Sequence, residues 1–310
     1  MNKNKVSIVI PTYNEEKDIE NTLKNLFLFH NYVKEILVID DSIDNTETIV
    51  RELSKKNKLL KYFKNPETGG RGEARNYGIK ISTGDYVMIL NADVSLSSNF
   101  FDIALKHFED GHDIILSKSI IKNNDKNYSR YLELLISYDF LYNLNKIHWT
   151  EAFICKRSVF NDKSNYFFSE NKKLKLSSGE DALFAKKIIN KGFSYIIDTN
   201  LINIQTVPDN LKEFWLIRTN RGRGSAVYKN IVKNISIVKI ILTTILRSIL
   251  YFLEIFFFIP IFISSFYLIY KVEKKISFKD TFSILIPAAI EKISFIYGEI
   301  KGIKEIISQN

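Results

Sequence analysis

The stretch VSIVIPTYNEE, residues 6–16, shows a pattern that decides the fold: a short apolar run that ends in polar side chains. Its β-branched residues Val6–Ile10 predict a buried strand. Two later runs end in the same way: Glu35–Ile39 leads into Asp40 and Asp41, and Tyr86–Leu90 leads into Asn91 and Asp93. If these strands are parallel, their polar ends meet at one edge of the sheet, where open α/β sheets bind ligands.

Stretches with helical spacing separate these runs and support a parallel arrangement. The predicted helices are Asp18–Phe29, Thr46–Lys56, Glu73–Ile81 and Asp181–Asn190, and Asp113–Lys118 and Ser194–Ile197 are further predicted strands. Strands that alternate with helices form right-handed βαβ units. Burying the strand-end carboxylates together is costly unless a cation or a donor compensates. The alternative is that each acid only caps a helix or makes a turn, which we prefer for Asp44 and Asn45.

The composition narrows the class of protein. The chain has 310 residues with 44 Lys and Arg, 35 Asp and Glu, and one cysteine, Cys155. A single cysteine excludes an intrachain disulfide framework and a cysteine-based zinc cage. No sequence signature points to DNA or RNA, so we expect no nucleic acid partner. The apolar run before Pro11 is too short for a signal peptide, so we expect the N-terminal domain to stay in the cytoplasm.

Five segments, taken in order, resemble the family 2 glycosyltransferases of the GT-A fold: VSIVIPTYNEE, VIDDSIDNT, GGRGEARNYGI, GDYVMILNADV and SGEDALFAKKIINKG. The similarity covers about residues 5–225. It implies a Rossmann-like α/β fold with a mixed, mainly parallel sheet flanked by helices. It also implies an enzyme that moves a sugar from a nucleotide-diphosphate donor to a hydroxyl group with inversion, using Mg²⁺ or Mn²⁺.

The resemblance also implies a set of donor-binding residues. These are Pro11, Tyr13, Asn14 and Glu15 for base and ribose, the pair Asp40 and Asp41, and Gly70, Arg71, Arg75, Asn91, Arg218 and Arg221 around the diphosphate. A glycine-rich loop that opens a helix suits an anion, although it is also typical of an ordinary surface loop. The arginines near 218–223 also fit surface charge beside a membrane. A dinucleotide site is set aside because G-x-G-x-x-G is missing after the first strand.

Asn91-Ala92-Asp93 stands where the family has Asp-x-Asp. The resemblance makes Asp93 the metal ligand, and a hard divalent cation with oxygen ligands suits a departing diphosphate. Asn91 departs from the pattern, and either weakens metal binding or occupies a tolerant position. Many relatives carry a histidine where Gln205 and Thr206 stand here, so no histidine ligand is expected.

Asp181, with Glu180 beside it, resembles the family's catalytic base. Direct displacement needs a base that takes the proton from the attacking hydroxyl. Ser178 and Asp181 also fit a capping box at the start of a helix, and the two roles are compatible. On the acceptor side, the resemblance points to Trp149 and Glu151, and core packing is an equal alternative for Trp149.

The C-terminal part is apolar and basic. Between Arg247 and Lys271 lie 23 residues with one charge, Glu254, which is long enough to span a bilayer. Both flanks are basic, so a single crossing is disfavoured. A helix over this stretch would kink at Pro260. We expect a hairpin over 235–270 or a helix in the membrane interface, with 282–307 also interfacial. The alternative is a buried core helix or an oligomer contact.

The sequence thus predicts a catalytic domain over 1–228 and C-terminal membrane-associated helices over 229–310. The expected function is a membrane-associated inverting glycosyltransferase at the cell membrane, with its catalytic domain on the cytoplasmic side. Its acceptor is expected to be lipid-linked or a glycan precursor. The alternative is an inactive nucleotide-sugar-binding or scaffold protein, which Asn91 favours. A nucleotidyltransferase is a weaker option because no matching signature opens the chain. The sequence leaves the oligomeric state open.

Overall fold

The computed structural model describes residues 5–66, 70–167 and 178–309. By packing, the chain divides into two compact units. The first holds the described residues of 1–120, 145–170 and 181–206, and the second those of 121–144, 171–180 and 207–310. The predicted boundary between 228 and 229 lies within α7 (Leu211–Ile231), and the division of function at that point stays a prediction.

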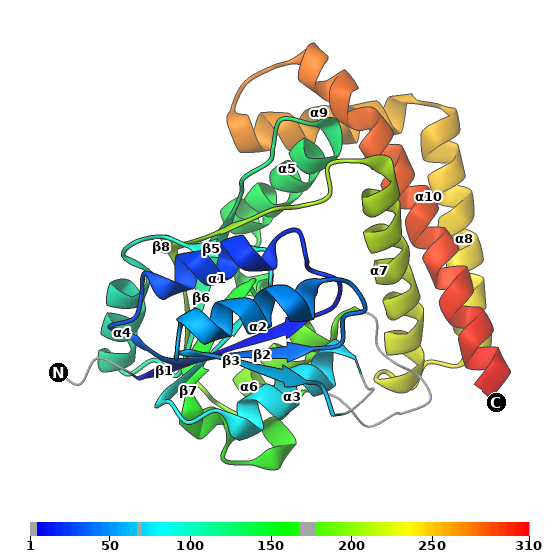
Figure 1. Ribbon diagram of the computed structural model, residues 1–310. Coiled ribbons are helices and arrows are strands. Elements are labelled where there is room, and N and C mark those ends of the chain that lie inside the picture. Colours follow the sequence, from blue (N-terminus) through cyan, green and yellow to red (C-terminus); the bar gives the residue numbers. More distant parts are fainter. Residues whose placement is uncertain (1–4, 67–69, 168–177, 310) are drawn as a thin grey trace. The chain divides into compact units, whose positions relative to one another are not determined.

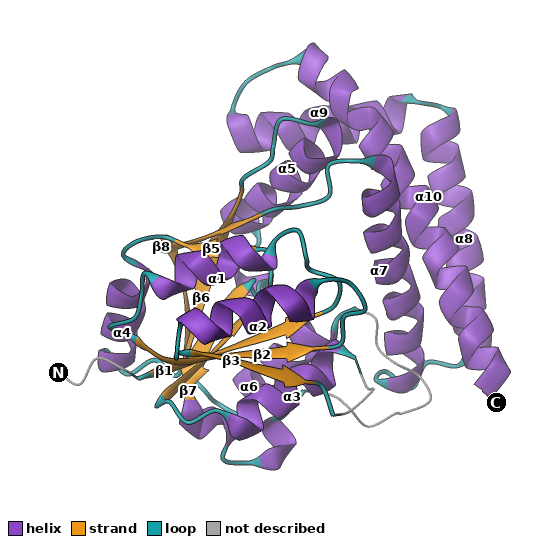
Figure 2. Cartoon of the chain, viewed as in Figure 1, coloured by secondary structure: helices purple, strands orange, loops and turns teal. Residues whose placement is uncertain are grey.

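The first unit is built on one mixed sheet with the strand order β3-β2-β1-β4-β7-β6-β8-β5 (Figure 2). Its strands are β1 (Val6–Thr12), β2 (Val33–Asp40), β3 (Leu60–Lys64), β4 (Tyr86–Leu90), β5 (Val94–Leu96), β6 (Ile114–Ile121), β7 (Ala152–Lys156) and β8 (Tyr195–Gln205). Strands β3, β2, β1 and β4 are parallel, whereas β7 is antiparallel to β4 and β6, and β5 to β8. The mixed α/β sheet predicted from the sequence is therefore confirmed.

Successive residues of the central strands point to opposite faces of the sheet, and helices cover both faces (Figure 1). Ile8 and Ile10 pack in a core with α1 (Ile19–Phe27), α2 (Thr46–Lys56) and α4 (Phe100–Glu109). Val9 instead packs in a second core with α3 (Arg71–Ile81) and α6 (Glu180–Asn190). Burial on both faces explains why these strands read as continuous apolar runs rather than alternating ones.

The sequence pattern located most of these elements. It predicted no strand at β3 or β5, because β3 has two lysines among its five residues and β5 has only three residues. The predicted strand Ser194–Ile197 is the beginning of the longer β8. The predicted strand Asp113–Lys118 corresponds to β6, which lies between α4 and α5 (Asn127–Tyr142).

The second unit is helical in its described residues. It contains α5, α7, α8 (Ile237–Phe256), α9 (Ile259–Glu273) and α10 (Phe278–Gln309). Phe214 of α7, Ile269 of α9 and Ile284 of α10 share its main apolar core. The chain bends by 85° between α8 and α9, and Pro260 lies in the first turn of α9, which confirms the predicted break. Among the described helices, α10 is long and apolar enough to cross a membrane, and α8 and α9 qualify together as a bent pair.

Candidate functional site

The loops that follow β1 and β2 are joined by hydrogen bonds at the carboxyl edge of the sheet. The backbone N–H of Asn14 donates to Ser42 Oγ at 2.8 Å, and the N–H of Ile43 donates to Asn14 Oδ1 at 3.0 Å. Asn14 has a φ of 60°, a left-handed conformation that asparagine tolerates better than most residues. The N–H of Glu15 donates to Thr46 Oγ1 at 2.9 Å. The two predicted donor-binding segments therefore form one rim.

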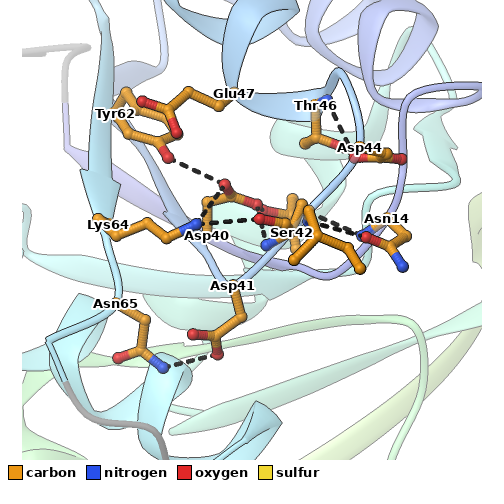
Figure 3. Close-up of polar contacts among 12 residues, drawn as sticks. Asn14, Asp40, Asp41, Ser42, Asp44, Thr46, Glu47, Tyr62, Lys64 and Asn65 are labelled. Carbon is orange, nitrogen blue, oxygen red and sulfur yellow. Dashed lines mark hydrogen bonds and ion pairs between the residues drawn. The ribbon is translucent and has the colours of Figure 1, made fainter.

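The two aspartates at the end of β2 differ in their surroundings (Figure 3). Asp40 is fully buried and accepts hydrogen bonds from Thr12 Oγ1 at 2.7 Å and Tyr62 Oη at 2.9 Å. Asp41 is only partly buried, and Asn65 Nδ2 donates to it at 2.8 Å. Asp40 therefore holds the strand ends together, while Asp41 keeps a carboxylate edge that a ligand can reach.

Carboxylates from four segments of the first unit come within electrostatic reach of one another. Burial, then the charges of Asp93 and Asp18, raise the pKa of Glu15 to about 8. Burial is also the main reason why the pKa of Asp93 is raised to about 6. Burial, then the charges of Asp93 and Asp181, raise the pKa of Glu151 to about 7. Burial and neighbouring carboxylates therefore disfavour the ionised forms of these three acids, and such perturbed pKa values are typical of functional sites.

Asn91 and Glu151 contact each other directly, which sequence reasoning missed. The side chain of Asn91 donates a short hydrogen bond from Nδ2 to Glu151 Oε2, and its backbone N–H donates to the Glu151 carbonyl at 3.3 Å. The contact follows from the antiparallel register of β4 and β7, which pairs Leu90 with Ala152. A carboxylate thus faces position 91 from the neighbouring strand. The sequence offered no signal for this, because it does not reveal which strand pairs with β4.

The predicted diphosphate residues of the first unit lie at the start of α3. Gly70 precedes the helix with a φ of 92°, and its partner Gly69 in the motif lies outside the described residues. Arg71 is exposed in the first turn. Its positive charge partly offsets the rise in the pKa values of Glu15, Asp93 and Glu151. A cation at a helix N-terminus beside acidic groups can hold an anionic ligand there.

Arg75 and Trp149 form a more enclosed part of the site. Arg75 is fully buried, and its guanidinium lies 4.9 Å from the Trp149 ring and 5.1 Å from the Phe167 ring. Trp149 also stacks on Phe153 at 4.7 Å between ring centroids. The core-packing alternative for Trp149 is therefore what its contacts show, and its predicted contact with an acceptor stays a prediction.

The candidate base lies at the start of α6. Asp181 is the second residue of this helix and is partly buried, and its charge contributes to the raised pKa of Glu151. Glu180 beside it is buried. The end of β8 lies beside Asp93, since the N–H of Thr206 donates to the Asp93 carbonyl at 3.4 Å. The segment where relatives carry a histidine therefore adjoins Asp93.

The remaining predicted donor residues belong to β1, to the loop that follows it and to α7. Pro11 is buried within β1, and Tyr13 is exposed in the loop that follows. Arg218 and Arg221 belong to α7 of the second unit. Arg218 is buried there, with Nη1 3.4 Å from Glu291 Oε1, whereas Arg221 is exposed. The donor contacts of both arginines stay predictions.

The acidic cluster suits a divalent cation that also binds a ligand. Among the described residues, no group of three or more His, Cys, Asp or Glu side chains is arranged to hold a metal by itself. Mg²⁺ is commonly bound by one or two carboxylates together with substrate phosphates rather than by a complete protein cage. Asp93 supplies hard oxygen donors, and Glu15 and Glu151 lie within electrostatic reach of it. A bound cation would lower the raised pKa values of these three carboxyl groups.

Solved structures of two glycosyltransferases have a similar fold. A mannosyltransferase from Pyrobaculum calidifontis, PcManGT, in complex with GDP-Man and Mn²⁺, has a TM-score of 0.55 at 22% identity, over 72% of this chain and 62% of PcManGT. Residues 1–349 of TarS from S. aureus, in complex with UDP-GlcNAc, have a TM-score of 0.52 at 20% identity, over 96% of this chain and 91% of TarS 1–349. At these identities the likeness concerns the fold.

The sequence comparisons show the family as well as the fold. An uncharacterised glycosyltransferase of Rickettsia conorii is 32% identical over 133 residues, which are 43% of this chain but only 22% of that relative. The chain therefore matches about a fifth of the length of this relative. The family model for glycosyl transferase family 2 matches residues 7–175, from the first strand past Asp93 and Glu151. Since this match extends over more than half of the sequence, the chain belongs to glycosyl transferase family 2, a family of transferase enzymes.

Proposed function

We propose that the chain transfers a sugar from a nucleoside-diphosphate sugar to a hydroxyl acceptor, with inversion at the anomeric carbon. One observation carries this proposal: carboxylates from four separate segments meet at the carboxyl edge of the sheet, where Asp93 acts on Glu15 and Glu151, and Asp181 acts on Glu151. Such a concentration of acids is costly to fold. A site that binds a cation together with a diphosphate, and that also needs a base, requires such acids for its function.

The rim formed by the loops after β1 and β2 suits the nucleoside part of the donor. Asp41 offers a partly exposed carboxylate to a base, and Glu15 can accept hydrogen bonds from ribose hydroxyls. Tyr13 is 62% exposed, so its ring is available for stacking. The ligands GDP-Man and UDP-GlcNAc in the two similar structures support this class of donor without selecting a base or a sugar.

The carboxylates divide between two tasks. Asp93 would hold Mg²⁺ or Mn²⁺, and Glu151 and Glu15 lie within electrostatic reach of it. When bound, the cation neutralises the charge that develops on the leaving diphosphate. Asp181 takes the proton of the acceptor hydroxyl as its oxygen bonds to the anomeric carbon. The bond from that carbon to the diphosphate oxygen breaks on the opposite face, and a nucleoside diphosphate leaves. One displacement of this kind inverts the configuration.

The membrane is the proposed location of this reaction. Helices α8, α9 and α10 expose many large apolar side chains, including Leu242, Phe256 and Phe282. A chain held at the cell membrane with its catalytic residues in the cytoplasm would meet a lipid-linked acceptor or a membrane-delivered glycan precursor. The domain assignment, catalytic over 1–228 and membrane-associated over 229–310, belongs to the same proposal.

A second candidate is a nucleotide-sugar-binding protein without catalysis. It is favoured by Asn91, which has no charge where the family pattern has an aspartate. Glu151 argues for an active site instead, because its carboxylate faces Asn91 from the neighbouring strand. The two candidates differ in turnover and agree in donor binding.

A screen of nucleotide sugars with the purified chain tests the proposal. Binding and hydrolysis are measured in parallel with added Mn²⁺, added Mg²⁺ or a chelator. Metal-dependent binding together with slow hydrolysis supports the transferase. Metal-dependent binding without any hydrolysis or transfer to lipid-linked or glycan acceptors supports the binding protein. If no nucleotide sugar binds, both candidates are wrong.

A further inference from the structure

Helix α8 presents its apolar side chains outward. A row of large apolar residues at helical spacing is exposed along its whole length, including Leu242, Ile245, Leu246, Ile249, Phe252 and Phe256. Between residues 240 and 256 the only charged residues of this helix are Arg247 and Glu254. A surface helix of a water-soluble unit has the opposite arrangement, with apolar residues inward and charges outward.

The two charges of α8 beyond Lys239, which are Arg247 and Glu254, are turned toward α10. Arg247 Nη1 donates to Glu299 Oε1 at 2.6 Å, and Lys292 Nζ lies 2.6 Å from Glu254 Oε2. Glu299 is fully buried, and Lys229 of α7 also binds it at 2.7 Å. Charged groups therefore hold α8 to the unit from within. The outer face is left to contact an apolar environment.

The exposed apolar surface continues around the bend into α9 and the first turns of α10. Phe258, at the break between α8 and α9, stacks with Phe282 of α10, and Phe262 stacks with Phe278. Phe258, Phe278 and Phe282 are all exposed. Contiguous apolar patches of more than a few hundred Å² are unusual on monomeric soluble proteins and mark contact surfaces.

The charges around this surface identify an anionic partner. Every acidic residue of 229–309 pairs with a basic residue of the same unit: Glu254, Glu273, Asp280, Glu291, Glu299 and Glu305. Lys239 at the start of α8 and Lys279 at the start of α10 are exposed, and no carboxylate among the described residues pairs with them. Exposed lysines beside an apolar face match the headgroups and the hydrocarbon of an anionic bilayer. A second copy of this chain would bring the same positive charge to the contact.

The packing of α10 argues against a crossing of the bilayer. α10 runs alongside α7 and α8 (Figure 1), and its glycines approach α7 very closely. A Cβ atom added at Gly298 would collide with the carbonyl of Thr219, and one at Gly302 would lie 2.7 Å from the carbonyl oxygen of Arg223. α7 carries Arg218, Arg221 and Arg223, which are too costly to place in hydrocarbon. α10 cannot enter the membrane core without α7 or without losing this contact.

We propose that the outward faces of α8, α9 and the first turns of α10 form one surface that lies on an anionic lipid bilayer, and that no helix of this unit crosses the bilayer. The 85° bend fits this arrangement, because two helices at that angle can lie in one plane but cannot make one straight span. This inference deepens the membrane association proposed above and does not depend on the transferase chemistry.

Flotation of the full chain with phosphatidylcholine vesicles, with and without phosphatidylglycerol, tests the surface. We expect binding to the anionic vesicles, weakened by salt. Leu246→Ser and Phe252→Ser, at side chains 60% and 62% exposed, should each weaken binding by about tenfold. Leu216→Ser on α7, at a side chain 59% exposed, is the matched control and should bind like the unchanged chain. Equal binding by all three variants would overturn the surface.

Cysteine labelling tests whether α10 crosses. Cys155 is fully buried and is the single cysteine of the chain, so new thiols can be followed against a low background. Lys279→Cys and Lys304→Cys place one thiol near each end of α10. In sealed inverted membrane vesicles, we expect a membrane-impermeant maleimide to label both. Labelling of one thiol in inverted vesicles only and of the other in right-side-out vesicles only would show a crossing and refute the proposal.

Two further measurements separate the alternatives. In sedimentation experiments the lipid-free chain should not form a dimer through this surface. A dimer that Leu246→Ser dissociates, together with unchanged vesicle binding by that variant, would assign the surface to a second copy of the chain. Nucleotide-sugar hydrolysis, measured in detergent, should be the same in Leu246→Ser and the unchanged chain. Vesicle binding without any hydrolysis would count against the proposed function and leave this surface intact.

Discussion

The pKa of a buried carboxylate is shifted in opposite directions at the two edges of the same sheet. At the amino edge, Glu35 accepts hydrogen bonds from Ser7 Oγ at 2.8 Å, Thr83 Oγ1 at 2.7 Å and Lys61 Nζ at 2.8 Å. Burial alone would raise its pKa, but these donors lower it to about 2. At the carboxyl edge, the pKa of Glu151 is raised to about 7 by burial and by neighbouring acids.

The difference distinguishes an acid that stabilises the fold from an acid kept for a ligand. Glu35 is a buried charge with matching donors, and such groups favour folding once they are paired. Glu151 accepts from one amide, and burial together with the charges of Asp93 and Asp181 outweighs the opposing charges of Arg71 and Arg75, so its ionised form is disfavoured in the free protein. We therefore expect substitutions at the carboxyl edge to alter activity and those at the amino edge to alter stability.

The largest effect on activity is expected from Asp181→Asn. Without a base, transfer should fall by roughly 10²–10⁴-fold, the usual contribution of general base catalysis. Donor affinity should stay close to that of the unchanged chain, because the proposed donor contacts lie elsewhere. Turnover and nucleotide-sugar binding are measured on the same preparation. Full turnover in this variant would refute the assignment of the base.

Asp93→Asn should have the next largest effect. Removal of the proposed metal ligand should weaken Mn²⁺-dependent donor binding by about 10–100-fold, while metal-independent nucleotide binding changes little. Isothermal titration with and without Mn²⁺ separates the two quantities. Asp102→Asn, at an acid on α4 that accepts from Tyr32, is a control for general loss of negative charge. Equal titration curves for Asp93→Asn and the unchanged chain would contradict the ligand role.

Metal affinity should also depend on pH in a defined direction. The pKa values of about 6 for Asp93 and about 7 for Glu151 mean that protons compete with the cation in the acidic range. Affinity for Mn²⁺ should therefore fall as the pH drops below 7, by about tenfold per pH unit for each proton displaced, and level off above both values. Titrations between pH 5 and pH 8 measure this slope. A constant affinity over that range would show that neither carboxylate binds the metal.

A smaller effect is expected from exchanging the Asn91–Glu151 pair. Asn91→Asp alone places two carboxylates in contact. It should lower the temperature of thermal unfolding and reduce Mn²⁺-dependent turnover severalfold. Combining it with Glu151→Gln restores one amide and one carboxylate with the donor on the other strand. We expect the double variant to recover most of the loss, and thermal unfolding and turnover measure both changes. Strictly additive effects of the two substitutions would show that the pair is not coupled.

From the sequence we could predict the features of the two edges that depend only on which residues follow one another along the chain. Most helices and strands follow from apolar periodicity, although β3 and β5 do not. The roles of Asp93 and Asp181 rest on the resemblance to the family and stay predictions. The pairing of Asn91 with Glu151 could not be predicted, because it depends on the antiparallel register of strands that are far apart in the sequence. Glu35 gave no signal either, since its donors come from three separate segments. For α8 the pattern indicated an apolar helix, but only the ion pairs of Arg247 and Glu254 show which face is turned outward.

The smallest effect on activity is expected at the amino edge, from Glu35→Gln. This variant keeps the shape of the side chain but loses its charge-assisted hydrogen bonds, so the free energy of unfolding should fall by about 1–3 kcal/mol at neutral pH. Because the pKa of Glu35 is lowered in the folded chain, its stabilising contribution is complete above pH 4.5, the ordinary value, and is lost as the pH falls toward 2. The difference between variant and unchanged chain should therefore be constant from pH 6 to pH 8 and shrink in acid. Denaturant unfolding at several pH values measures it, and Mn²⁺-dependent donor binding should not change. If Glu35→Gln impaired donor binding as strongly as Asp93→Asn, the two edges of the sheet would not be separate in function.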